Sequence, residues 1–397
     1  MKLLEGVEVL DVGRYVAGPY CATLLGYLGA RVTRIERRDG GEDRYIAPLF
    51  TRGERPGEGG LFMQTGCGKR SVAIDVSKPD GLRILARLAE KSDVVVANAT
   101  PAALAKLGLD WPAFSARNPR GILVTQTGFG SSGPDAAKGG FDGVAQAMSG
   151  AMCLTGTPEH PVKAGAPYAD FSTAVFSALG ALAALMAREA SGAGQHVETS
   201  LLGTALAVMN SHLAEQAVTQ INRPGTGNRV QTSAPSDVFE TLDGHILVHT
   251  VGDGIFRRWA KLIGKPALAE QPEYQGDQAR GDRRDELCGI MAAWCIERTT
   301  DEALSELAKA GVPSGPVLTQ QQALDNPQVA AMEFFRMVDF PGLQTQAPVA
   351  DLPIRFSALA AGIAGRPPLL GEHTREALLE IGYSDQDIDA LSRDGVI

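Results

Sequence analysis

The sequence predicts an α/β protein with a Rossmann-like large domain, built on a parallel sheet, and a smaller α+β domain. Three observations carry this prediction. Short β-branched runs alternate with helical patterns through the first two hundred residues. A nearly all-apolar, alanine-rich stretch at 169–190 is typical of a buried helix. After residue 220 the pattern changes to a hairpin signal followed by separate helices.

The first elements form a βαβ unit. The β-branched run 7–12 predicts a strand, 13–19 a loop, 20–28 a helix and 30–37 the next strand. The alternation continues with strands at 71–75, 93–98 and 121–127, and helices at 79–91 and 101–107. Such a succession predicts a parallel sheet covered on both faces. Ligands bind at the carboxyl ends of these strands, so the loops after Val12, Asn98 and Thr127 are the expected ligand-binding places.

The later elements follow in order. The long helix at 169–190 precedes a short strand at 196–198 and a second helix at 201–219. Residues 220–236 are rich in Gly, Pro, Asn, Thr and Ser and predict a loop. Strands at 238–241 and 245–250 flank an Asp-Gly turn, and helices are expected at 256–262, 285–297 and 301–310. A smaller domain is therefore placed at 222–325. The tail carries strand signals at 337–339 and 354–357 and helices at 372–381 and 385–392.

Composition excludes several classes of protein. The chain has 397 residues and a net charge of -9, which argues against a nucleic-acid or anionic-membrane partner. Its five cysteines form no CxxC pair and its six histidines lack metal-ligand spacing, so we expect reduced thiols and no metal. The N-terminus lacks a signal-peptide pattern, and the apolar stretch 174–187 is shorter than a bilayer span of about 20 residues. These features predict a cytoplasmic protein.

Known nucleotide and hydrolase motifs are missing from the sequence. The loop at 13–19 lacks the G-x-G-x-x-G fingerprint, which disfavours a nicotinamide dehydrogenase. Glu36 ends the second strand and is followed by Arg37 and Arg38. Two arginines at this strand end could bind a phosphate group. The spacing alone favours two arginine side chains exposed to solvent. No P-loop, G-x-S-x-G or Cys–His pair occurs, and no histidine is assigned a catalytic role.

Asp170 directly precedes the long apolar helix and has two interpretations. The first is an N-cap whose side chain accepts a backbone hydrogen bond. The second is a nucleophile, because a carboxylate held ionised at the mouth of an apolar site can attack a carbonyl carbon. The helix dipole stabilises an anion at this position in either case. The sequence pattern alone favours the cap.

Several segments together resemble the family III CoA-transferases, which include formyl-CoA transferase and carnitine CoA-transferase. The similar segments are LEGVEVLD at 4–11, VAGP at 16–19, LGARVTRIER at 28–37, KRSVAID at 69–75, NPRGIL at 118–123, FD at 141–142, QAMSG at 146–150, GVPSGP at 311–316, LGEHT at 370–374 and IGYS at 381–384. Their order and spacing cover nearly the whole chain. No single motif is decisive.

The resemblance implies that Asp170 is the nucleophile of an acyl-CoA:carboxylate CoA-transferase. In that chemistry an aspartyl anhydride and then an aspartyl-CoA thioester form, without ATP or a metal. Backbone N–H groups of a glycine-rich loop would stabilise the oxyanions, and residues 224–228 are the candidate loop. The partners would be an acyl-CoA donor and a small carboxylic acid acceptor, with coenzyme A carried as part of the substrate.

The resemblance also implies residues that bind coenzyme A. They are Val16 and Ala17 along the ligand, Arg37 at the 3'-phosphoadenosine end, Ile74 and Asn98 beside adenine and pantetheine, Lys106 and Lys138 as phosphate candidates, and Phe141 bordering the site. The chain departs from the family at three of its positions. Ala97 and Ala99 stand where Glu and Phe are common, and Lys106 stands where arginine is common. Position 99 therefore has no aromatic ring to stack on adenine.

The family's architecture implies a large domain made from 1–221 and 326–397, a small domain at 222–325, and an interlocked homodimer. Two alternatives stay open. An α-methylacyl-CoA racemase needs a Gly-His-Asp histidine, whereas Phe141 stands there and cannot move a proton. A non-catalytic CoA-binding protein would use Asp170 only as a cap. A cation near the acyl group would suit a dicarboxylate such as succinate or mesaconate, and Arg14, Arg44 and Arg52 are candidates.

Overall fold

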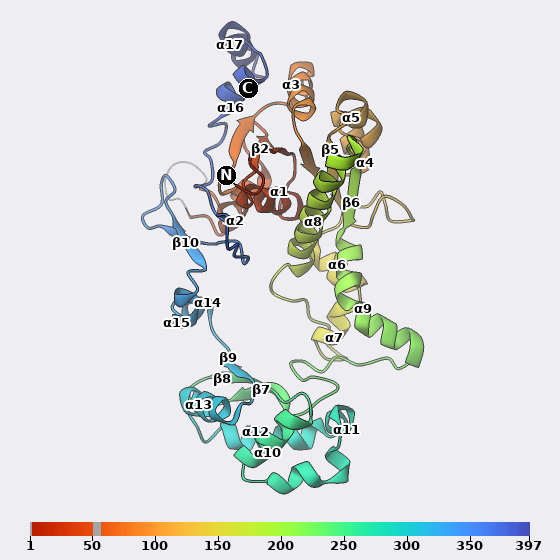
Figure 1. Ribbon diagram of the computed structural model, residues 1–397, viewed down its shortest axis with the longest axis vertical. Helices are drawn as coiled ribbons and strands as arrows, with labels where there is room; N and C mark the ends of the chain where they lie inside the picture. The colour runs from red at the N-terminus through yellow and green to blue at the C-terminus, as the bar shows by residue number, and fades with distance from the viewer. Residues whose placement is uncertain (1, 51–56) are drawn as a thin grey trace. The chain divides into compact units, whose positions relative to one another are not determined.

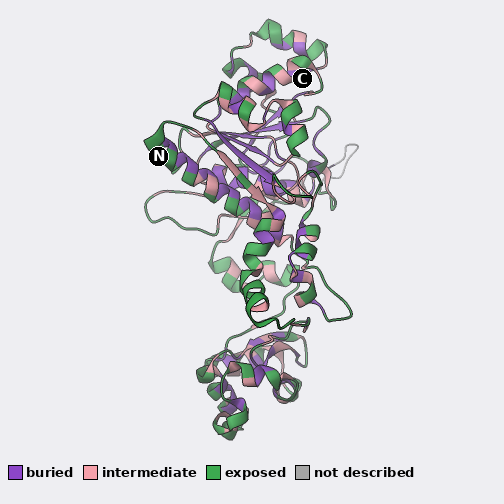
Figure 2. Cartoon of the chain, turned by 90° about the vertical axis from the view of Figure 1, so that its right-hand side faces the viewer, coloured by how far each residue is buried: buried purple, intermediate pink, exposed green. Residues whose placement is uncertain are grey.

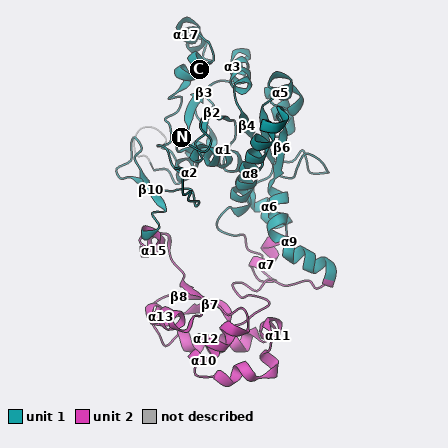
Figure 3. Cartoon of the chain, viewed as in Figure 1, with its two compact units in different colours: residues 1–149, 164–218, 331–397 teal, residues 150–163, 219–330 magenta. Residues whose placement is uncertain are grey.

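The computed structural model describes residues 2–50 and 57–397. The chain divides into two compact units (Figure 3). The large unit comprises residues 1–149, 164–218 and 331–397, and the small unit comprises 150–163 and 219–330. Both chain ends belong to the large unit. The segment 150–163 belongs to the small unit although it lies far from the rest of that unit in sequence.

The large unit is built on one six-stranded parallel sheet with the order β3-β2-β1-β4-β5-β6 (Figure 1). The strands are β1 (Glu8–Asp11), β2 (Arg31–Glu36), β3 (Arg70–Ala73), β4 (Val94–Ala97), β5 (Ile122–Thr127) and β6 (His196–Ser200). The predicted parallel sheet is confirmed. The strand order reverses between β1 and β4, and such a reversal opens a crevice at the carboxyl ends of those two strands.

Helices cover both faces of this sheet. On one face α1 (Ala17–Tyr27) and α8 (Tyr168–Ser191) pack against each other and against alternate strand residues such as Val96 and Val124. On the other face α3 (Pro79–Glu90), α5 (Trp111–Arg117), α16 (Thr374–Glu380) and α17 (Asp385–Arg393) pack over Val95 and Leu123. Strands β1 to β5 are mostly buried between these layers, whereas the edge strand β6 is partly exposed (Figure 2).

The helix α8 is the element that positions the candidate nucleophile. Its alanines Ala174, Ala178, Ala181 and Ala184 are buried against the sheet. Small side chains let the helix backbone approach β5 and β6 closely. Among the described residues, α8 alone has the length and apolar composition of a membrane-spanning helix. It has 24 residues, so the expectation that this segment is too short for a span was wrong. Its alanine face is occupied by the protein's own sheet.

The small unit is an α+β assembly. Its antiparallel sheet contains β7 (Ser236–Glu240), β8 (His245–His249) and β9 (Ser314–Pro316). Its helices include α10 (Asp253–Leu262), α11 (Asp277–Asp282), α12 (Arg284–Cys295) and α13 (Thr300–Ala310). Trp259, Phe256 and Met291 lie at the centre of a core of its own.

Several predicted elements differ from the structure in their bounds, and two of these differences have a clear account. The first helix begins at Ala17 and not at residue 20, because a proline such as Pro19 is tolerated in a first turn that needs no N–H donor. The strand predicted at 354–357 was wrong, since that segment is irregular. The antiparallel strand pair in this part of the chain is formed by β10 (Phe335–Val338) and β11 (Ala347–Ala350).

Further elements connect these layers. They are η1 (Glu42–Tyr45), α2 (Gly60–Gly66), α4 (Pro101–Leu107), α6 (Asp142–Met148), α7 (Ala151–Thr155), α9 (Leu201–Thr219), η2 (Pro266–Glu270), η3 (Pro272–Tyr274), α14 (Gln320–Leu324) and α15 (Pro327–Ala331). The helices at 101–107 and 201–219 match their predicted bounds. All five cysteines are free thiols.

Candidate active site

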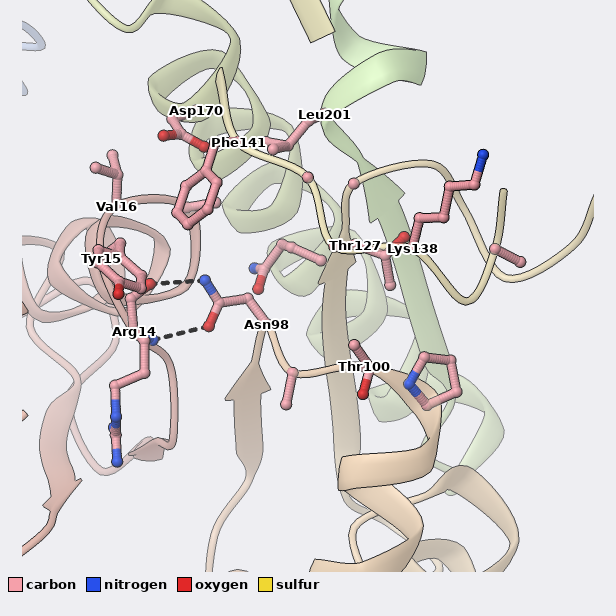
Figure 4. Close-up of a pocket in the computed structure, with 18 of the residues that line it drawn as sticks. Arg14, Tyr15, Val16, Asn98, Thr100, Thr127, Lys138, Phe141, Asp170 and Leu201 are labelled. Carbon is pink, nitrogen blue, oxygen red and sulfur yellow. Dashed lines mark hydrogen bonds between the residues drawn. The ribbon is translucent and has the colours of Figure 1, made fainter. Parts of the chain in front are cut away.

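A pocket of about 230 Å³ lies in the large unit at the reversal of strand order. The loops that follow β1, β4 and β5 line it, together with the first turns of α1, α8 and α9 (Figure 4). These are the loops after Val12, Asn98 and Thr127 that the sequence singled out. The parallel register brings their three strand ends side by side.

The first of these loops is held by three side chains from different parts of the large unit. Each of three consecutive backbone N–H groups donates to one of them. Gly13 N–H donates to Asp11 Oδ1 at 2.9 Å, Arg14 N–H to Asn98 Oδ1 at 2.7 Å, and Tyr15 N–H to Asp43 Oδ2 at 3.1 Å. The conformation of the loop is therefore fixed without a ligand.

Two close approaches explain the loop's residue types. A Cβ on Gly13 would lie 2.8 Å from Pro19 Cδ, so only glycine fits where the loop folds against α1. Tyr15 has φ +63°, which costs a non-glycine residue roughly 1 kcal/mol. This backbone conformation places the Tyr15 ring edge-to-face with Phe141, with 5.5 Å between ring centroids. The pair forms one wall of the pocket.

A buried ionic cluster supports the same loop from below. Lys69 Nζ lies 2.7 Å from Asp11 Oδ2 and also donates to Pro19 O at 2.7 Å. Arg34 lies 2.6 Å from the Asp43 carboxylate that holds Tyr15. Burial alone would raise the pKa of Glu36, but Arg34 and Arg44 lower it to about 2. Lys69 and Arg34 thus pair with the two carboxylates, Asp11 and Asp43, that accept hydrogen bonds from the loop.

Asp170 is the third residue of α8, and it is not the N-cap that the sequence pattern favoured. Asp142, the first residue of α6, supplies the capping oxygen. Its Oδ1 accepts from Ala169 N–H at 2.8 Å and from Asp170 N–H at 3.3 Å, and its Oδ2 accepts from Gln146 Nε2. Asp142 is distant in sequence from α8, so no local pattern indicated this cap. The Asp170 carboxylate is left free of a capping role.

The electrostatic setting of Asp170 is that of a reactive carboxylate. Burial, and then the neighbouring Asp142 carboxylate, raise the pKa of Asp170 to about 6. Its side chain accepts no hydrogen bond from the residues that the structure describes. The N-terminal end of α8 favours the ionised form through its dipole. The group is therefore mostly ionised at neutral pH, poorly solvated and open to the pocket.

The structure brings seven of the predicted site residues together around this pocket. They are Arg14, Val16, Ala17, Asn98, Lys138, Phe141 and Asp170. Asn98 also donates from Nδ2 to Arg14 O at 2.7 Å, so its amide bonds to the loop on both sides (Figure 4). The Lys138 ammonium is largely exposed and lies 2.5 Å from Asp135.

Three predicted coenzyme A contacts lie outside the pocket lining. Ile74 directly follows β3 in the chain and is buried in the core. Lys106 is exposed in the last turn of α4. Arg37 is exposed and forms ion pairs with Asp39 at 2.8 Å and Glu42 at 3.3 Å.

The arginine candidates for a substrate carboxylate have other roles in the structure. Arg14 Nη1 donates to Gly13 O at 2.9 Å and Ile35 O at 3.1 Å, so the guanidinium is directed toward β2 and away from Asp170 (Figure 4). Arg44 is fully buried, pairs with Glu36 at 2.7 Å and stacks over Phe62. Its predicted place at the border of the site was wrong, because that charge is neutralised in the core. Arg52 lies outside the described residues.

Sequence reasoning missed several residues of the pocket. Tyr15, Gln126 and Thr127 line it, as does Leu201 at the start of α9. Tyr15 lies within the loop that was singled out. Its position in the pocket wall depends on a positive φ, which the sequence pattern does not predict. Gln126 lies between Thr125 and Thr127 at the end of β5, so its polarity did not distinguish it from its neighbours.

The candidate oxyanion loop at 224–228 belongs to the small unit. There Gly227 N–H donates to Gly156 O at 2.8 Å, so this N–H group is already bonded. Among the described residues, no group of three or more His, Cys, Asp or Glu side chains is arranged to hold a metal ion.

Comparisons with known proteins give a consistent family. Residues 4–374 match the model of CoA-transferase family III. The chain is 34% identical to the succinyl-CoA--D-citramalate CoA-transferase of Chloroflexus aurantiacus, over 99% of this chain and 98% of that protein. It is 32% identical to the succinate--glutarate CoA-transferase of Agrobacterium fabrum, with 95% of each chain covered. It is 33% identical to the succinyl-CoA:mesaconate CoA-transferase of Haloarcula marismortui, over 96% of this chain and 97% of that protein.

Solved structures agree with this result. A CAIB/BAIF family protein from Brucella suis superposes with a TM-score of 0.84 at 31% identity, covering 96% of this chain and 99% of that one. Rv3272 from M. tuberculosis superposes with a TM-score of 0.81 at 27% identity, covering 94% and 98%. The sequence-based expectation of this family is confirmed. The chain belongs to CoA-transferase family III and is a CoA-transferase.

Proposed function

We propose that this CoA-transferase moves coenzyme A between carboxylic acids through covalent intermediates on Asp170, with succinyl-CoA or another dicarboxylyl-CoA as donor. One observation carries the proposal. The Asp170 carboxylate opens into the pocket at the reversal of strand order, while Asp142 performs the helix capping that would otherwise occupy it. The choice of donor is supported by relatives named for succinyl-CoA or succinate.

The first half of the reaction loads coenzyme A onto the enzyme. An Asp170 oxygen attacks the thioester carbon of the donor, the C–S bond breaks, and the CoA thiolate leaves an acyl–aspartyl anhydride. The thiolate then attacks the aspartyl carbonyl carbon. The anhydride C–O bond breaks, the donor acid departs as its carboxylate, and an aspartyl-CoA thioester remains.

The second half uses the same steps in reverse order. The acceptor carboxylate attacks the aspartyl thioester carbon and displaces the CoA thiolate, which gives a second anhydride. The thiolate attacks the acceptor's acyl carbon, so that acceptor acyl-CoA forms and the Asp170 carboxylate is restored. No net proton is consumed, and the energy of one thioester is conserved in the next.

The loop after β1 and the pocket residues would hold coenzyme A for these steps. Val16 and Ala17 lie in the rigid first turn, and Asn98 fixes the preceding loop through two hydrogen bonds. The Tyr15–Phe141 wall would exclude water from one side of Asp170. Arg37, Lys106 and Lys138 remain the proposed phosphate contacts, and the first two would act beyond the pocket itself.

We further propose that the chain forms a homodimer. The face of α8 opposite its alanines exposes the large apolar side chains Val175, Phe176, Leu179 and Met186. The spacing of these residues makes them a stripe on one side of the helix. Monomers rarely expose such stripes.

Sedimentation equilibrium is expected to give twice the chain mass at micromolar concentration, and a monomer mass there would contradict the proposal.

The covalent proposal is tested by trapping. The chain is incubated with succinyl-CoA, hydroxylamine is added, and the protein is digested and its peptide masses are measured. Hydroxylamine converts an activated aspartyl carbonyl to a hydroxamate, so we expect one modified residue, Asp170. Measurable CoA binding without a modified Asp170 would reject the covalent mechanism.

The trapping rate should depend on pH in one direction. The attacking form is the carboxylate, and the pKa of Asp170 is about 6. Below that pH the protonated fraction grows, so the initial rate of modification is expected to be half-maximal near pH 6 and to fall about tenfold for each further pH unit. A rate that stays constant from pH 7 to pH 5 would contradict this assignment.

A further inference from the structure

Four polar side chains form a row across adjacent strand ends, on the face of the sheet that α1 and α8 cover. Strand alternation defines this row. Val9, Val94, Val96, Ile122, Val124 and Val197 all pack on that face. Two residues beyond the last apolar member of each strand come Asp11 on β1, Asn98 after β4, Gln126 on β5 and Thr199 on β6. Gln126 pairs with Thr199, and Asn98 directly follows Ala97, the partner of Thr125, so these three side chains are level. Asp11 lies two residues earlier in the register, level with Val96.

Three of these four side chains have hydrogen-bond partners within the protein. Asp11 bonds Lys69 and Gly13 N–H. Asn98 bonds the Arg14 backbone in both directions. Thr199 Oγ1 lies 2.7 Å from Ser177 Oγ on α8. Each of these side chains therefore has a structural task that explains its polarity.

Gln126 is the exception. Its side chain is 2% exposed, and neither Nε2 nor Oε1 has a hydrogen-bond partner. A buried amide that lacks partners destabilises a fold, and an apolar residue of similar size would be better there. Rule-breaking positions of this kind concentrate at functional sites. Gln126 lines the same pocket as Asp170, so a ligand in that pocket would lie beside its side chain.

The charged side chains that line the pocket among the described residues are Arg14, Lys138 and Asp170. Neither cation is directed toward the Asp170 carboxylate. The Arg14 guanidinium bonds to backbone carbonyls and Lys138 pairs with Asp135 in the outer part, and both side chains point away from Asp170 (Figure 4). A polar group on the acyl chain bound there would meet a neutral amide. An amide donates from Nε2 to a carboxylate or hydroxyl oxygen and accepts at Oε1 from a hydroxyl.

We propose that Gln126 is the specificity-determining residue of this transferase, and that its amide binds a second oxygen group on the acyl chain, either a carboxylate or a hydroxyl. This inference rests on the proposed function, since it assigns the acyl group to the Asp170 end of the pocket. Binding of such an acyl group satisfies the amide that the empty pocket leaves unpaired. When an acyl group with no such oxygen binds, the Gln126 amide stays without a hydrogen-bond partner. The enzyme should therefore bind oxygen-bearing acyl groups more tightly than apolar ones.

The test measures affinity without turnover. The full chain with Asp170→Asn is titrated calorimetrically with butyryl-CoA, 3-hydroxybutyryl-CoA and succinyl-CoA, with and without Gln126→Leu. These thioesters share the four-carbon length, and they carry no further oxygen group, a hydroxyl on C3 and a terminal carboxylate, respectively. We expect Gln126→Leu to reduce the affinity for one or both oxygen-bearing thioesters, relative to butyryl-CoA, by about 10- to 100-fold. The affected thioester identifies the bound group as a hydroxyl or a carboxylate. The melting temperature should stay equal or rise.

Thr199→Val is the matched control, because it removes a partnered hydroxyl from the same row. It should lower the melting temperature and leave the affinity ratios unchanged. Unchanged ratios in Gln126→Leu would overturn the proposal. An equal loss for all three thioesters would also overturn it, by placing the amide on the shared pantetheine arm. Failure to trap a hydroxamate on the wild-type chain would reject the covalent mechanism alone, since these affinities need no reaction.

Discussion

Replacing Asp170 by asparagine is expected to lower the rate of CoA transfer by at least about 10⁴-fold while the chain stays folded. Asparagine keeps the shape of the side chain but has no anionic oxygen to attack a thioester. The cap of α8 is unaffected, because it is made by Asp142. Steady-state transfer from succinyl-CoA to a dicarboxylic acid measures the rate, and circular dichroism measures the fold. The affinity for CoA should change less than tenfold.

Two further variants make this result specific. Asp170→Ala should be equally inactive, which guards against slow conversion of asparagine back to aspartate. Glu189→Gln removes an exposed carboxylate from the same helix and should keep full activity. A residual rate above one-tenth of the wild type in both Asp170 variants would mean that another group attacks the thioester.

The position of the site could be predicted from the sequence because parallel sheets constrain it strongly. Alternating β-branched runs and helices define the strand ends, and loops after those ends converge. The loops after Val12, Asn98 and Thr127 do line the pocket. Asp170 was found by its place before an apolar helix, although the reason offered for that place, an N-cap, was wrong.

The remaining features depend on contacts between distant segments. Asp142 caps a helix that begins 26 residues later, and Asp43 holds Tyr15 across 28 residues. Arg44 was a candidate for the border of the site, but it pairs with Glu36 inside the core. Hydrophobic periodicity reports which face of an element is buried. It does not report which polar partners meet across elements, so the cluster under the loop and the free amide of Gln126 were not predictable.

Replacing Lys69 by methionine is expected to lower the free energy of unfolding by about 3–5 kcal/mol, because it leaves the buried Asp11 carboxylate without its cation. Both side chains are buried, and Lys69 also donates to Pro19 O. Methionine fills a similar volume, so the loss comes from charge and not from packing. Asp11 Oδ1 accepts from Gly13 N–H, so the loop after β1 should loosen and CoA affinity should fall as well. Urea unfolding and calorimetric titration measure the two effects.

A double-mutant cycle separates the buried charge from the lost contacts. Asp11→Asn combined with Lys69→Met removes both charges, so the double variant should be less destabilised than the two single variants added together. Lys91→Met, on the exposed side of the same unit, should change stability by less than about 0.5 kcal/mol. Additive losses in the cycle would show that Asp11 and Lys69 act independently. In that case the loop after β1 would not depend on the Asp11–Lys69 pair, and its coupling to that pair would be refuted.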